Sequence, residues 1–123
     1  MALTYSVNAK NARLQAAADL ILGGEIELWE SGVVMLGSWT ISGALTAGAS
    51  VLSVTNVEAN NAINAVAAGT ANLIRIRNAG DTEYVIDNVS VSISGGGGDV
   101  QFDSVNVSLN QEITLGAITI THV

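Results

Sequence analysis

Cysteine and proline are both absent from this chain of 123 residues. The lack of cysteine excludes disulfides, thiolate metal sites and a cysteine nucleophile. The lack of proline, together with 13 glycines, favours a tight, turn-rich β protein and argues against a proline-rich linker or a long disordered tail. Aromatic residues make up only 4% of the chain although apolar residues make up 49%, so we expect an aliphatic core.

Basic residues are also scarce. Four of them stand against 11 acidic residues, which gives a formal net charge of −7. Non-specific binding to nucleic acid needs clustered Lys and Arg, so no nucleic-acid partner is expected. No apolar run approaches the roughly 20 residues that span a bilayer, so no membrane partner is expected either. The N-terminus lacks the pattern of a secretion signal, so we expect a protein that is made in the cytoplasm and not exported by the usual route.

The dominant pattern that is present is alternation of apolar and small polar residues between Gly69 and Val123. A period of two is typical of half-buried strands, whose successive side chains point to opposite faces. Turn-forming clusters at 78–81, 95–98 and 110–111 interrupt the alternation where hairpin turns are expected. The pattern predicts a mainly β protein, an antiparallel β-sandwich of jelly-roll-like type. The alternating apolar sets are Ile74 and Ile76; Val89, Val91 and Ile93; Val105, Val107 and Leu109; and Ile118 and Ile120.

One short N-terminal α-helix is predicted over residues 7–22. Ser6 is its expected N-cap, and the glycines at 23–24 end it. Its apolar stripe includes Leu14 but consists largely of alanine, so the helix must pack on the sheet or against a neighbouring subunit.

The whole chain, 1–123, is predicted to be a single domain with a β-sandwich over 25–123. Strands are expected at 25–30, with Ile26 and Leu28 inward, at 33–39 and at 51–57. Residues 42–50 are interpreted as a loop, and 58–68 remain ambiguous between a turn of helix and a strand.

No catalytic, cofactor or metal site is predicted, and we do not expect an enzyme. His122 is the only histidine, and no nucleophile or orienting carboxylate lies near it in the sequence. The four glycines before Asp99 do not form a phosphate loop, because a strand follows them and no Lys-Ser or Lys-Thr pair is present. The acidic residues lack the spacing of a known calcium loop.

The residues selected as interface candidates are Leu14, Trp29, Trp39, Arg75 and Arg77. Arg75 and Arg77 share one strand face, where they either pair with Glu83 across a hairpin or contact an acidic neighbouring subunit. The two tryptophans are expected to be core residues or anchors of a subunit interface rather than platforms for a ligand.

Several segments together resemble a family of small proteins encoded among the structural genes of tailed bacteriophages and prophages. They are residues 8–16 (Asn-Ala-Lys-Asn-Ala-Arg-Leu-Gln-Ala), 25–30, 69–80, 97–99 and 118–121. The resemblance implies a structural virion protein on the capsid surface, synthesised in the host cytoplasm: a decoration (cement) protein that binds the outer surface of the capsid and stabilises the head. The implied partners are the major capsid protein and the chain itself, as a homotrimer or another homo-oligomer. Residues 31–68 depart from the family pattern, which has a glycine-proline-rich loop there.

Two alternatives remain open at this point. The first is a structural subunit of a phage tail, baseplate or fibre, which would form rings or stack axially. The second is a carbohydrate-binding β-sandwich that acts in host adsorption, which requires Trp29 or Trp39 to be exposed beside Asp or Asn side chains.

Overall fold

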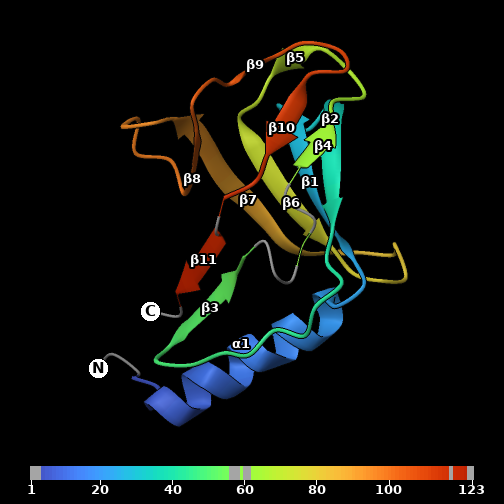
Figure 1. Cartoon of the computed structure of the whole chain (residues 1–123). Helices are drawn as coiled ribbons and strands as arrows, with labels where there is room; N and C mark the ends of the chain where they lie inside the picture. The colour runs from blue at the N-terminus through green and yellow to red at the C-terminus, as the bar shows by residue number, and fades with distance from the viewer. Residues whose placement is uncertain (1–3, 56–58, 60–61, 117, 122–123) are drawn as a thin grey trace.

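A single helix packs along one side of a mainly β body in the computed structural model, which describes residues 4–55, 59, 62–116 and 118–121 (Figure 1). The prediction of a mainly β chain with one N-terminal helix is confirmed. The elements are α1 (Val7–Ile21), β1 (Glu25–Glu30), β2 (Val34–Thr40), β3 (Val51–Val54), β4 (Ala62–Asn64), β5 (Gly69–Thr70), β6 (Leu73–Arg77), β7 (Tyr84–Ile93), β8 (Val100–Phe102), β9 (Asn106–Val107), β10 (Glu112–Thr114) and β11 (Ile118–Thr121).

The helix begins and ends where its local sequence directs. The Ser6 hydroxyl accepts a hydrogen bond from the Ala9 backbone N–H at 3.1 Å, which satisfies one of the unpaired donors of the first turn. Gly23 has a φ of 80°, a conformation that glycine adopts without steric cost, and it stops the helix. Leu14, Ala18 and Ile21 are buried, and α1 packs against β3.

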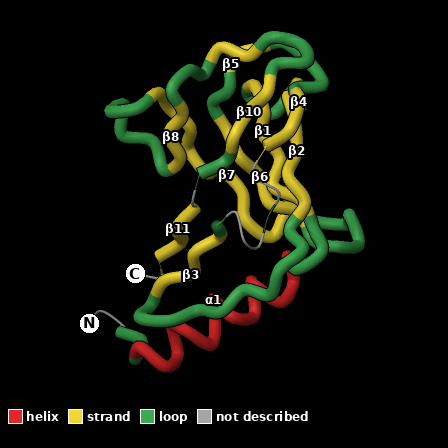
Figure 2. The backbone as a smooth tube through the Cα atoms, in the orientation of Figure 1, coloured by secondary structure: helices red, strands yellow, loops and turns green. Residues whose placement is uncertain are grey.

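A five-stranded mixed sheet forms the main body, with the strand order β2-β1-β6-β7-β8. Neighbouring strands pair antiparallel, except that β7 and β8 are parallel. The remaining strands pair as β10 with β4, β11 with β3, and β5 with β9. Figure 2 shows how the sheet curls and how the β3–β11 pair lies between it and the helix. The predicted antiparallel jelly-roll-like sandwich is not confirmed, because the sheet is curled and mixed.

The glycine cluster at 95–98 does not form the predicted hairpin turn. It returns the chain so that β8 runs parallel to β7, with Val91 opposite Val100. Gly95 and Gly97 both have a φ of 84°, and a Cβ on Gly98 would lie 2.8 Å from the Ser92 backbone nitrogen. Left-handed backbone and close approach therefore allow two parallel strands to be joined by a short loop, where a longer crossover is usual.

Asp99 ties this loop to β7, because its carboxylate accepts from the Ser90 N–H at 3.1 Å and from the Ser90 hydroxyl at 2.9 Å. These bonds lower the pKa of Asp99 below its ordinary value of 3.8. Stabilisation by Asp99 is therefore present above the unfolded-state pKa and is lost as the pH falls through the lower folded-state pKa.

For Asp99→Asn we expect a loss of less than about 1 kcal/mol at pH 7, since the carboxylate is exposed and screened. The difference from the unsubstituted protein should vanish in acid. Urea unfolding between pH 2.5 and pH 7 measures the loss and its pH dependence. A difference that is constant over this range, or that grows in acid, would contradict the assignment.

Residues 105–111 depart from the predicted strand and turn, whereas the strand predicted around Ile118 and Ile120 is observed as β11. Of the strand predicted at 105–109, only Asn106–Val107 forms a β-strand, which pairs with β5. Leu109 is exposed. The turn at 110–111 joins β9 to β10, which belong to different sheets, so it is not a hairpin turn. The ambiguous stretch at 58–68 contains β4, while residues 56–58, 60–61 and His122 lie outside the described residues.

The core is aliphatic apart from Trp39, which is completely buried. Its ring stacks on Phe102, with the ring centroids 6.4 Å apart. Leu14 is also buried, with 6% of its surface exposed. Both side chains lie inside the subunit, because the helix and β2 each direct one apolar face into the core. Trp39 thus takes the core role, one of the two expected for it, and the interface role of both residues stays a prediction.

Candidate functional site

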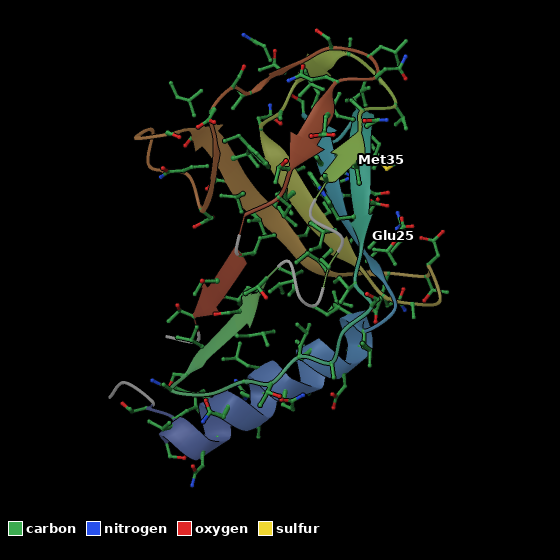
Figure 3. The ribbon with its side chains drawn as sticks, in the orientation of Figure 1. Glu25 and Met35 are labelled. Carbon is green, nitrogen blue, oxygen red and sulfur yellow. The ribbon has the colours of Figure 1, made fainter. Side chains whose placement is uncertain are left out.

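The outward face of β1, β6 and β7 carries a cluster of arginine, aromatic and acidic side chains, which we call the arginine cluster. Strand register brings it together, since Glu27 pairs with Arg75 and Arg77 pairs with Tyr84. Glu25 and Met35, labelled in Figure 3, lie on the side of the molecule that β1 and β2 form. The members of the arginine cluster are Glu27, Trp29, Arg75, Arg77, Asp81, Tyr84 and Asp87.

Arg77 is at the centre of the cluster. Its Nε lies 3.3 Å from Glu27 Oε2 and 2.8 Å from Asp81 Oδ1, and its Nη2 donates to the Tyr84 hydroxyl. The guanidinium carbon also lies 4.1 Å from the centre of the Tyr84 ring. Desolvation lowers the pKa of Arg77, but the attraction of Glu27, Tyr84 and Asp81 outweighs it and raises the pKa above its ordinary value. Arg77 is therefore a permanent cation.

Arg75 is held between two aromatic rings. Its guanidinium carbon lies 5.1 Å from the centre of the Trp29 ring and 4.9 Å from the centre of the Tyr84 ring, within the range of cation–π attraction. Its Nε lies 3.1 Å from Asp87 Oδ1. A Cβ on Gly32 would lie 2.9 Å from Arg75 Nη2, so the turn between β1 and β2 also packs on this guanidinium.

Glu27 is buried beneath the cluster and contacts two of its members, Trp29 and Arg77. Its side chain is 6% exposed, and it is the buried charged residue among those the structure describes. Its Oε1 accepts from the Trp29 indole N–H at 3.1 Å, while its Oε2 faces Arg77. One carboxylate therefore orients both an aromatic ring and a guanidinium on the sheet surface.

The cluster has the composition and exposure of a protein interaction surface. The side chains of Arg75 and Arg77 are each 22% exposed, and Trp29 and Tyr84 are half-buried. Tryptophan, tyrosine and arginine are the residues that most often dominate binding energy at interfaces. Since these side chains are already ordered by their neighbours, little conformational entropy would be lost when a partner binds them.

Three of the five predicted interface candidates, Trp29, Arg75 and Arg77, meet in this cluster. The predicted partner Glu83 is not paired with either arginine; Asp87, Asp81 and Glu27 take that place. The sequence prediction missed Glu27, Tyr84 and Asp87. For Glu27 a signal was present: in the alternating strand at 25–30, with Ile26 and Leu28 inward, Glu27 and Trp29 necessarily share the outward face.

No group of three or more His, Asp or Glu side chains among the described residues is arranged to hold a metal ion. Open cavities of about 270, 220 and 210 Å³ are lined by the β8–β10 region, by β7 with β11, and by residues 23–25 with 77–81. In the described part of the chain, no helix is long and apolar enough to cross a bilayer.

Comparison with protein-family models, with curated proteins and with solved structures finds no match for this chain. Its function must therefore be inferred from the residues and their geometry.

Proposed function

We propose that this protein is a structural virion component, a bacteriophage capsid decoration protein that binds the outer surface of the head and stabilises it. The observation that carries the proposal is the arginine cluster: a pre-ordered surface of Trp29, Arg75 and Tyr84 on the outward face of a sheet. A second support is the resemblance of the N-terminal helix and the C-terminal strands to small phage structural proteins. In this role the partners are the major capsid protein and other copies of the chain.

The geometry suits attachment to a lattice. Apart from Asp81 in the turn between β6 and β7, the cluster lies on three hydrogen-bonded strands, so it presents these side chains at fixed spacing. A decoration protein meets the same capsid surface many times over, and moderate contacts then add through multivalency. The carboxylates beside each arginine keep the surface from being uniformly cationic, and they favour a partner that presents both charge signs.

Removing the Arg75 side chain should weaken attachment. For Arg75→Ala we expect binding to expanded capsids to fall about tenfold to a hundredfold, because both ring contacts and the ion pair are lost. Arg75→Lys keeps the charge but not the planar stacking on two rings, so it should recover only part of the loss. Co-sedimentation with expanded capsids of the cognate phage, saturated at increasing protein concentration, measures both variants.

The matched control is Glu83→Gln, a change of one charge at an exposed position beside Tyr84 in the chain but outside the cluster. Binding by this control should equal that of the unsubstituted protein, and circular dichroism should show that all variants fold. If the unsubstituted protein does not sediment with capsids, or if Arg75→Ala binds normally, this surface does not serve the proposed role. Imaging of intact particles then locates the protein on the head or on the tail. A location on the tail would favour a tail or baseplate subunit.

Carbohydrate binding is the second candidate, because Trp29 is half-exposed and its indole N–H donates to the Glu27 carboxylate, although the Asp or Asn side chains expected beside it are replaced by this glutamate. Against it, Arg75 lies over the indole ring at 5.1 Å and occupies a face on which a sugar would stack. Trp39 contributes nothing to such a site, since it is buried. Glycan-array binding that Trp29→Ala removes would favour this function over capsid attachment.

A further inference from the structure

The N-terminal end of α1 presents a second surface, made of Tyr5, Val7, Lys10 and Arg13, which we call the α1 end patch. Tyr5 is 39% exposed and Val7 is 54% exposed, although Val7 lies on the same side of the helix as the buried Leu14. The guanidinium of Arg13 lies 4.1 Å from the centre of the Tyr5 ring. The Ser6 cap and a 2.8 Å hydrogen bond from the Ser50 N–H to Asn11 Oδ1 hold this end of the helix in place.

The two cations of this patch have no acidic partner in the described part of the chain, although Arg13 lies over the Tyr5 ring. The chain has four basic residues, and Arg75 and Arg77 are both in ion pairs, whereas neither Lys10 nor Arg13 forms one among the described residues. Lys10 lies at the end of the first turn of α1, where the positive end of the helix dipole disfavours a cation, and Arg13 lies in the next turn. The helix dipole therefore does not account for Lys10, whereas an anionic partner surface would attract both cations.

A groove of matching character lies at the other end of the molecule, where β8 and β10 line a cavity of about 270 Å³. Two of the residues that line it, Phe102 and Ile113, are apolar, half-buried and buried respectively, and the other five are polar. Asp103 and Glu112 are exposed at this cavity, and neither is in an ion pair among the described residues. This surface, which we call the acidic groove, places two such carboxylates beside two apolar side chains, as the α1 end patch places two cations beside Tyr5 and Val7.

We propose that the α1 end patch of one copy docks into the acidic groove of a second copy. The helix and the β8–β10 region lie at opposite ends of the molecule (Figure 1), so the two surfaces meet only between copies. Val7 and Tyr5 then lie against Phe102, while Lys10 and Arg13 pair with Asp103 and Glu112. Because the two surfaces differ, the contact is heterologous, and repetition about one axis closes into a cyclic oligomer such as a homotrimer.

Charge reversal tests the pairing directly. Light scattering at low ionic strength should show association of the unsubstituted protein, which weakens as salt rises. The double variant Lys10→Glu/Arg13→Glu should associate about tenfold to a hundredfold more weakly, and so should Asp103→Lys/Glu112→Lys. When the two variants are mixed, the acidic patch of the first variant meets the basic groove of the second, so opposite charges face each other again. The mixture should therefore associate although neither variant does so alone.

The control for the groove variant is Asp19→Lys/Glu83→Lys, which makes the same change in net charge at exposed positions outside both surfaces. It should associate at least as well as the unsubstituted protein. The proposal is overturned if the unsubstituted protein stays monomeric at all concentrations, if the mixture fails to associate, or if the control loses association as well. The outcome does not depend on capsid attachment, which uses the arginine cluster and is measured separately.

Discussion

Trp39→Ala is expected to destabilise the protein by about 3–5 kcal/mol, the usual cost of truncating a large aromatic side chain in a core. Trp39 is the largest fully buried side chain of the described chain, and it stacks on Phe102. Truncation removes its apolar contacts and leaves a cavity that the surrounding core fills only in part. In a small domain, a loss of this size removes a large fraction of the net stability.

Trp39→Phe separates the packing of this residue from its polarity. The Trp39 indole N–H has no hydrogen-bond partner among the described residues, and a buried unpaired donor costs about 1–3 kcal/mol. Phenylalanine removes that donor and keeps an aromatic ring against Phe102. We therefore expect Trp39→Phe to cost less than about 1.5 kcal/mol, because relief of the unpaired donor offsets part of the lost volume.

Urea unfolding followed by circular dichroism measures both substitutions. Leu109→Ala is the control, since Leu109 is an exposed apolar residue and its truncation should change stability by no more than about 0.5 kcal/mol. A Trp39→Ala variant that loses less stability than Trp39→Phe would contradict the placement of this ring in the core.

Glu27→Ala is expected to cost about 2–3 kcal/mol of stability, because Glu27 is the buried charge that orients the arginine cluster. The substitution removes the acceptor of the Trp29 indole N–H and the buried counter-charge of Arg77. Glu27→Gln should cost less, since an amide oxygen still accepts from Trp29 while the ion pair is lost. Thermal and urea unfolding measure the two variants.

A double-mutant cycle separates the ion pair from the other effects of these substitutions. Arg77→Met leaves the Glu27 carboxylate buried without its cation, so it should destabilise the protein more than Arg77→Lys does. In the Glu27→Gln/Arg77→Met double variant the unpaired charge is gone, and the loss should be smaller than the sum of the two single losses. Additive losses would mean that the two side chains do not interact as their 3.3 Å separation indicates.

The same substitutions connect the core to the proposed surface. The Glu27 carboxylate accepts a hydrogen bond from the Trp29 indole N–H and pairs with Arg77. Its removal should therefore loosen the arginine cluster as well as destabilise the fold. Capsid binding by Glu27→Gln, measured under conditions where the variant is folded, should then fall although Glu27 itself has almost no surface to contact a partner.

The amino-acid sequence by itself determined the local elements. The helix predicted at 7–22 is observed at Val7–Ile21, and the strand predicted at 25–30 is observed with the same bounds. Ile26 and Leu28 are buried as predicted, and so are Ile74 and Ile76. These features follow from neighbouring residues alone: a cap, a stop glycine, and a period of two in side-chain direction.

Only the tertiary structure decided which strands are neighbours, and with them the site. Glu27 and Arg77 are 50 residues apart in the chain, and they meet because β1 pairs with β6 in one particular register. The burial of Trp39 likewise depends on contacts between distant segments. The parallel pairing of β7 and β8 depends on how the glycine loop between them packs against Ser92, which the alternation of apolar residues does not record. A period-two pattern indicates which side chains of a strand share a face, but it does not indicate which other strand pairs with that strand. The reason is that every strand offers the same backbone donors and acceptors to any partner.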